Sequence, residues 1–269
     1  MVDDRQGHNG ARRPRPASGG RSGPGRVRPA QPQSTAGPDA QDHRTSHDAS
    51  GGPAIPPGVE ARQLAPEVRR ELSTLDRATA DAVARHLVAA GELLDEDPEA
   101  ALTHARAARA RSSRIAAIRE AVGIAAYRCG DWAQALAELR AARRMGSKSS
   151  LLALIADCER GLGRPERAIE LARGPEAAQL SGDDADELRI VVAGARADLG
   201  QLEQALTVLS SPQLDPSRKG STAARLFYAY ADTLLALGRD DEALHWFLRC
   251  AAADIEGVTD AEERLSELG

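Results

Sequence analysis

The segment Gly130-Asp-Trp-Ala-Gln-Ala-Leu136 decides the fold, because variants of it recur along the chain. Its counterparts are Gly163-Arg-Pro-Glu-Arg-Ala-Ile169, Gly200-Gln-Leu-Glu-Gln-Ala-Leu206, Gly238-Arg-Asp-Asp-Glu-Ala-Leu244 and, without the glycine, Asp97-Pro-Glu-Ala-Ala-Leu102. In each copy an alanine precedes leucine or isoleucine. These alanines are Ala101, Ala135, Ala168, Ala205 and Ala243, at intervals of 34, 33, 37 and 38 residues. Five copies in phase indicate an internal structural repeat.

The residues between these copies favour helix. From Pro66 onward Ala, Leu, Arg and Glu dominate, and these are strong helix formers. No stretch alternates apolar and polar residues as a half-buried strand would. Each copy begins where one helix of about three to four turns ends and the next starts. The sequence therefore predicts an all-α chain of about five antiparallel helix pairs.

In this pattern the chain resembles the tetratricopeptide repeat family, whose unit is a helix pair of about 34 residues. The resemblance covers about residues 78–253 and implies a right-handed solenoid of stacked pairs. The matching positions are Ala89 in the first copy, Gly123, Gly130, Trp132, Ala135, Leu139 and Ala142 in the second, Ala156 and Gly163 in the third, Ala193 and Gly200 in the fourth, and Phe227, Ala231, Gly238, Ala243, Phe247 and Cys250 in the fifth.

Close packing is the physical reason for such a pattern. Two helices approach to about 8–10 Å only where small residues face each other. A single pair cannot bury its apolar stripe, so at least about three stacked units are needed. We therefore expect the five alanines to be buried. At the ends, Pro66–Leu72 and Asp260–Leu268 read as capping helices, the first with Pro in its first turn and the second with acidic residues there.

Residues 1–58 differ from the helical-repeat domain at 59–269. They are rich in Gly and Pro and contain almost no large apolar residue before Ile55, so we expect a disordered tail. The tail carries eight Arg and five Asp, a net charge of +3, whereas the remainder of the chain carries −8. A basic tail on an acidic body fits contact with nucleic acid, an acidic lipid surface or the body itself, and equally a solubilising spacer.

Composition predicts a cytoplasmic protein. The chain opens with Met1-Val-Asp-Asp4 and lacks the apolar run of a secretory signal or membrane span. Cys129, Cys158 and Cys250 fit neither a disulfide framework nor zinc-ligand spacing. Arg is abundant and Lys scarce, which resembles the high-GC coding of actinobacterial proteins.

We find no pattern typical of catalysis, and we expect a protein that is not an enzyme and holds no metal or cofactor. Phosphate-binding Gly-Lys-Ser/Thr loops and Gly-x-Ser-x-Gly elbows are absent from the sequence. His86, His104 and His245 lie on different predicted helices without a second His at i+4, so we expect surface or groove histidines. The Asp95-Glu96-Asp97 cluster lacks the glycine and closing Glu of an EF-hand and reads as a helix N-terminus.

An arginine-rich stretch admits two interpretations. It comprises Arg106, Arg109, Arg111, Arg114 and Arg119, together with Arg140, Arg143 and Arg144. These side chains could contact phosphate or an acidic peptide. They could equally form a solvated helix face paired with the abundant Glu and Asp. No aromatic residues are interleaved for base stacking.

The family resemblance also implies a peptide-binding groove lined by the first helix of each pair. The corresponding positions are Glu120, Tyr127, Arg128, Asp157, Arg160, Glu187, Asp198, Arg225, Tyr228 and Asp232. Charges of both signs with two tyrosines suit specific peptide recognition, although the same residues could simply be exposed polar positions. Glu120 and Ala153 stand where clamping of a C-terminal carboxylate would need Lys, so we do not expect chaperone-tail binding.

Two functions follow from these features. The first is a protein–protein interaction scaffold that binds a peptide or protein segment on the first-helix side. The alternative is a regulator that associates with nucleic acid through its Arg-rich tail. The salt dependence of binding separates them, because counterion release makes binding to nucleic acid weaken steeply with salt.

Overall fold

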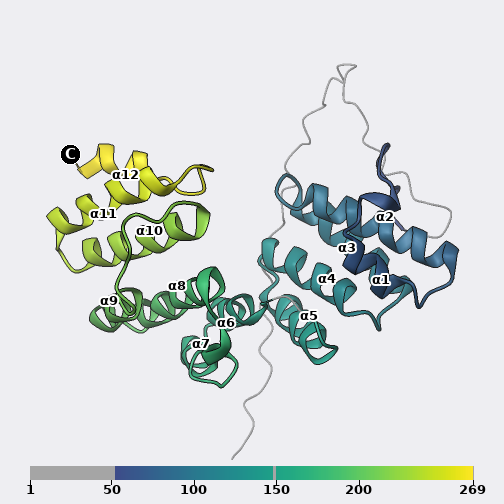
Figure 1. The fold of residues 1–269 in the computed structure, drawn as a ribbon. Coiled ribbons are helices and arrows are strands. Elements are labelled where there is room, and N and C mark those ends of the chain that lie inside the picture. The colour runs from purple at the N-terminus through teal and green to yellow at the C-terminus, as the bar shows by residue number, and fades with distance from the viewer. Residues whose placement is uncertain (1–51, 148–149, 269) are drawn as a thin grey trace, which may run out of the picture. The chain divides into compact units, whose positions relative to one another are not determined.

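The computed structural model describes residues 52–147 and 150–268. Over these ranges the chain consists of α-helices, two short 3-10 helices and connections, without a β-strand (Figure 1). The predicted all-α fold is therefore confirmed. The α-helices are α1 Pro66–Leu72, α2 Arg77–Leu93, α3 Pro98–Arg111, α4 Ala116–Arg128, α5 Trp132–Arg144, α6 Leu152–Gly161, α7 Pro165–Leu171, α8 Gly182–Asp198, α9 Leu202–Leu209, α10 Ser221–Ala236, α11 Asp240–Ala253 and α12 Ala261–Leu268, and the 3-10 helices are η1 Ala61–Gln63 and η2 Ala177–Gln179.

The ten helices from α2 to α11 form the five predicted pairs. Within each pair, the two helices joined by a short turn pack against each other: α2 with α3, α4 with α5, α6 with α7, α8 with α9, and α10 with α11. Neighbouring pairs also touch, because α3 contacts α4, α5 contacts α6, α7 contacts α8 and α9 contacts α10. The core accordingly consists of successive apolar clusters along the chain.

The five phased alanines are fully buried within these pairs. Ala101, Ala135, Ala168, Ala205 and Ala243 all have 0% of their surface exposed. The small positions of the first helices are buried as well, and Gly123 leaves no space for a side chain. A Cβ there would lie 2.7 Å from Leu139, which is itself fully buried. Small residues thus set the helix spacing, as the repeat predicts.

One turn geometry closes four of the five pairs. Gly130, Gly163, Gly200 and Gly238 have φ between 71° and 73°, the left-handed region that glycine adopts without steric cost. The amide after each glycine donates to the carbonyl five residues earlier, as in Asp131 to Ala126 (2.9 Å). The first pair lacks the glycine, and the Asp97 side chain instead caps α3 by accepting from the Ala100 amide at 2.9 Å. This capping confirms the reading of the acidic cluster as a helix start.

Additional elements cover both ends of the repeats. Helix α1 packs on α2 and α4, and α12 packs on α11, so both predicted capping helices are present. The chain joins the packed core even before α1, because Ile55 packs against the apolar cluster formed by Val59 with Val88 and Ala89 of α2. Residues 52–58, which the sequence assigned to the tail, therefore contribute to the packed domain. The rest of that tail lies outside the described residues.

The two longest repeat intervals correspond to short second helices. Helices α7 and α9 have 7 and 8 residues, whereas α3, α5 and α11 have 13 or 14. Residues 172–181, which include η2, follow α7, and residues 210–220 follow α9. The extra length thus enters the connections between pairs and leaves the turns within pairs unchanged.

Candidate functional site

The ten residues predicted to line a groove lie on the first helices of the second to fifth pairs. Helix α4 carries Glu120, Tyr127 and Arg128, α6 carries Asp157 and Arg160, α8 carries Glu187 and Asp198, and α10 carries Arg225, Tyr228 and Asp232. Many of them contact a residue on the neighbouring first helix. We call this series of polar contacts the first-helix ladder.

The centre of the ladder joins α4, α6 and α8. The Tyr127 hydroxyl donates to Asp157 Oδ2 at 2.5 Å, and Arg160 contacts Asp157 Oδ1 at 2.7 Å and Asp198 Oδ2 at 2.8 Å. Burial and the Asp157 carboxylate raise the pKa of Tyr127, so the phenol stays a protonated donor. The hydrogen bond to Asp198 raises the pKa of Arg160. Arg160 also covers Gly194, where a Cβ would lie 2.8 Å from the guanidinium carbon.

The ladder continues toward both ends. Arg128 pairs at 2.8 Å with Asp95, which follows α2. Glu187 pairs with Arg225, and Asp232 lies 3.5 Å from Arg264 of α12. These contacts join successive helices and give the residues a structural role. A ligand on this face would have to exchange ion pairs with them or bind beside them.

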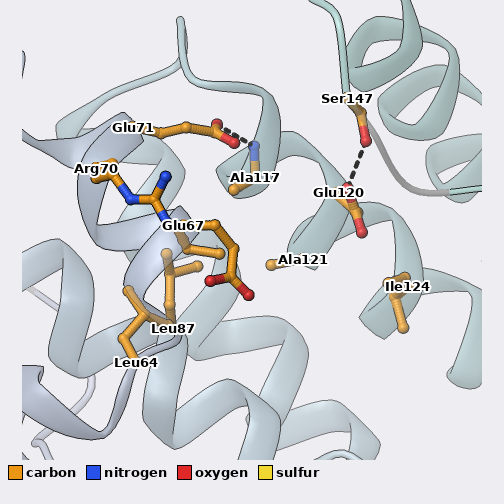
Figure 2. A pocket seen from close by; sticks show the side chains of 11 residues that line it. Leu64, Glu67, Arg70, Glu71, Leu87, Ala117, Glu120, Ala121, Ile124 and Ser147 are labelled. Carbon is orange, nitrogen blue, oxygen red and sulfur yellow. Dashed lines mark hydrogen bonds between the residues drawn. The ribbon is translucent and has the colours of Figure 1, made fainter.

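Glu120 lies in a different setting, beside a cavity of about 530 Å³ between α1, α2 and α4 (Figure 2). We call it the α1 pocket. Its apolar side chains come from Leu64, two residues before α1, and from all three helices, and its charged side chains come from α1 and α4. The lining residues are Leu64, Glu67, Val68, Arg70, Glu71, Leu87, Ala117, Glu120, Ala121, Ile124 and Ser147.

Two carboxylates of the α1 pocket are held by hydrogen bonds. Glu71 Oε2 accepts from the backbone amide of Ala117, in the first turn of α4, at 3.2 Å. Glu120 Oε2 accepts from the Ser147 hydroxyl at 2.7 Å. Figure 2 shows both contacts, with α1 and α4 each presenting a carboxylate. The first bond joins the capping helix to the second pair, so α1 helps to build the pocket.

Glu120 was predicted from the sequence, but the contribution of α1 was not, because the pattern at Pro66–Leu72 is that of a capping helix. The spacing of apolar and acidic residues in this segment does indicate that α1 contributes to the pocket. Leu64, Val68 and Leu72 recur every four residues and mark the side that packs on the repeats. Glu67 and Glu71 share the same spacing, which places two carboxylates along one line of the helix.

A second cavity, of about 570 Å³, lies between α8, α10 and the connection from α11 to α12. Two predicted residues, Arg225 and Tyr228, line it with Ile190 and Val258. The Tyr228 ring packs edge-on against Phe247, with ring centroids 5.4 Å apart. Burial, reinforced by the nearby Asp260 carboxylate, raises the pKa of Tyr228 to about 12. Like the α1 pocket, this cavity combines apolar and charged side chains.

Several members of the arginine-rich stretch are paired with acids. Arg109 and Arg119 both contact Glu138, and Arg140 contacts Glu159 at 2.6 Å. Glu138 and Glu159 are nearly fully buried. These arginines therefore satisfy buried carboxylates between pairs, which agrees with the interpretation as a paired helix face. A phosphate ligand would have to displace those carboxylates.

The expectation of surface or groove histidines is wrong for His86 and His104. Both are buried in the first pair, with their Nδ1 atoms 3.0 Å apart. The adjacent helices α2 and α3 bring them together, so each ring offers the other a polar partner inside the core. His245 is exposed, as expected. The described residues contain no group of three or more His, Cys, Asp or Glu side chains that could hold a metal ion.

The three cysteines are free thiols in the structure. Cys158 and Cys250 are buried, and burial raises the pKa of Cys158 to about 12. A thiol with so high a pKa is a poor nucleophile near neutral pH. Among the helices that the structure describes, none has both the length and the apolar character needed to cross a membrane.

Comparisons with known proteins give matches among solved structures. No protein-family model matches the chain, and no curated protein matches it. Among solved structures, the chain is similar to YrrB, described as a TPR protein with an unusual peptide-binding site. The two are 18% identical, the match covers 73% of this chain and 97% of that chain, and the TM-score is 0.44.

Proposed function

We propose that this chain is a protein-interaction scaffold that binds a peptide or protein segment along the first helices of its pairs. The observation that carries the proposal is the α1 pocket, about 530 Å³ in volume, with a largely apolar floor and charged side chains at its edge. Cavities of that size and composition accommodate side chains of a ligand, while a few polar groups fix its orientation.

The second cavity supports the same interpretation. It lies on first helices α8 and α10 and combines Ile190, Ala229 and Val258 with Arg225 and Asp260. Protein interfaces commonly place apolar anchors at the centre and polar groups at the edge. A protein-interaction scaffold would use both cavities to hold side chains of its ligand.

The test is selection of peptides by the full chain. A random peptide library is displayed, and sequences retained by the immobilised protein are compared with those retained by Glu120→Arg, Tyr228→Ala and Arg128→Glu variants, of which the first alters the α1 pocket. Glu166→Gln, an exposed position on α7, is the matched control. We expect enriched sequences that the control retains and that at least one first-helix variant loses.

Two results would contradict the scaffold proposal. One is the absence of any enriched peptide, and the other is enrichment that all variants share. Binding to DNA or RNA that weakens steeply with salt and vanishes on deleting residues 1–51 would instead favour the nucleic-acid alternative. Residues 1–51 lie outside the described part of the chain, and that alternative stays a hypothesis.

A further inference from the structure

We infer that the α1 pocket binds a peptide segment in which a bulky apolar side chain is flanked by arginine or lysine. The inference rests on the proposed scaffold function and names the chemistry of the partner at one cavity. It depends on three properties of the pocket: its apolar floor, its volume and its carboxylates.

The floor of the pocket is apolar and continuous with the core. Leu64 and Val68 pack on the N-terminal apolar cluster, and Leu87 belongs to it. Ile124 of α4 packs on the next cluster along the chain. A floor anchored in two clusters is already ordered, so a ligand side chain that enters it meets a preformed apolar surface.

The volume limits what can enter. At about 530 Å³ the α1 pocket lies within the range of about 300–1,000 Å³ in which proteins bind small ligands. It has room for one or two large side chains but not for a whole helix. An extended segment or one helical turn, with Phe, Leu, Ile, Met or Trp as anchor, matches that space.

The charge selects the residues that flank the anchor. Glu67 and Glu71 from α1 and Glu120 from α4 line the pocket, against one basic residue, Arg70. The hydrogen bonds to Ala117 and Ser147 position two of these carboxylates. A carboxylate accepts several hydrogen bonds, so each keeps capacity for a further donor. Guanidinium groups pair with carboxylates through two parallel hydrogen bonds.

The same charge argues against the other classes of macromolecule. Carboxylates on α1 and α4 repel the phosphates of nucleic acids and anionic lipids. An acidic peptide would place like charges together, which disfavours binding. A basic segment with an apolar anchor matches both the apolar floor and the carboxylates at its edge. A segment that has only the anchor or only the basic residues matches just one of these two features.

The experiment begins from the peptides that the full chain selects from an unbiased display library. We expect enriched sequences in which Arg or Lys flanks a bulky apolar residue. The affinity of these peptides is then measured by fluorescence anisotropy. Replacing the anchor with Ala is expected to weaken binding about tenfold or more. Replacing the flanking basic residues with Glu is expected to weaken binding at low salt more than at high salt.

Variants of the protein assign the binding to this pocket. Glu67→Arg changes an exposed α1 residue and is expected to weaken binding about tenfold. Glu166→Arg on α7 makes the same change outside the pocket and is expected to leave affinity unchanged. Ile124→Ala removes part of the floor without altering charge and tests the anchor separately. Melting temperatures of all three variants confirm that they are folded.

The outcomes separate this inference from the function on which it rests. Selected peptides that are acidic or uncharged overturn the inference and leave the scaffold function standing. Basic peptides whose affinity is unaffected by Glu67→Arg and Ile124→Ala also overturn it, because they bind elsewhere. A chain that selects no peptide contradicts both proposals.

Discussion

At the scale of single residues, small side chains at fixed positions allow the helices to pack closely. Ala135 is fully buried, and Gly161 packs so closely on Trp132 that a Cβ there would lie 2.5 Å from the indole ring. Large apolar residues such as Leu139 then fill the adjacent space. A core with few aromatic residues is therefore sensitive to added volume at its small positions.

Substitution of Ala135 tests this sensitivity. Ala135→Arg inserts bulk and an unpaired charge at a closed contact, and we expect a loss of about 3–5 kcal/mol in the free energy of unfolding. Ala137→Arg makes the same change at an exposed position on α5 and should cost less than about 0.5 kcal/mol. Denaturant unfolding of both variants measures the difference. Equal stabilities would contradict the assigned repeat packing.

The buried histidine pair predicts a dependence of stability on pH. Burial lowers the pKa of His104 below its ordinary value of 6.5. The unfolded chain takes up that proton near its ordinary pKa, whereas the folded chain does so only at lower pH. The contribution to stability is therefore present above about pH 6.5 and declines as pH falls below it.

The measurement compares melting temperatures at about pH 7.5 and about pH 5.5, where His titrates and most carboxylates do not. We expect the wild-type protein to melt at a lower temperature at the acidic pH. The variant His104→Gln should show a smaller difference between the two pH values. A difference that is the same in both proteins would assign the pH dependence to other groups.

At the scale of helices and turns, two glycines allow opposite predictions. Gly91 lies in α2 with open space around its Cα, and Gly91→Ala should stabilise the chain by about 0.5–1 kcal/mol by favouring helix. Gly238 has φ 73°, and Gly238→Ala should destabilise by about 1 kcal/mol. Thermal unfolding of the two variants measures whether each substitution raises or lowers the stability. A stabilising Gly238→Ala would contradict the left-handed turn.

The elements were largely predictable because each has a local cause. The phased alanines, the glycine turns and Pro66 mark helix contacts or boundaries directly in the sequence. The buried His86–His104 contact was not predictable in the same way, since a histidine on a helix carries no mark of the side it faces. The burial of Glu138 and Glu159 was also not predictable from the sequence, because it depends on arginine partners that lie on other helices.

The candidate site was predictable only in part. The family resemblance indicated the helices that carry the ten polar residues, but it could not show that many of them pair with one another. Those pairs depend on how adjacent first helices are spaced, as for Arg160 and Asp198. The α1 pocket depends on a capping helix outside the repeat, so a repeat alignment contains no position for Glu67.

At the scale of the whole described chain, the capping helices complete the apolar clusters. Helix α12 places Leu265 and Leu268 against the last cluster, and the Arg264 guanidinium lies 5.7 Å from the centre of the Phe247 ring. Without α12, part of this cluster would face water. The end of the array therefore depends on residues that do not belong to any repeat.

Removal of α12 tests that dependence. A chain that stops after Thr259 should lose about 2–5 kcal/mol of stability, because apolar surface of the last pair becomes exposed. It should also bind a hydrophobic dye more strongly than the full chain. Hydrogen exchange in α10 and α11 should rise more than in α2 and α3, since each pair contacts mainly its neighbours. Unchanged exchange in α10 and α11 would contradict the capping role.

The shared glycine turn has a consequence for how such a chain can change its length. Gly163 and Gly200 end their first helices with the same backbone geometry, and Ala168 and Ala205 follow each at the same distance. A deletion of residues 164–200 would join Gly163 directly to Gln201 and keep a glycine at the junction. Deleting or duplicating the gene segment between two such glycine codons would remove or add one repeat unit while preserving the local fold on both sides.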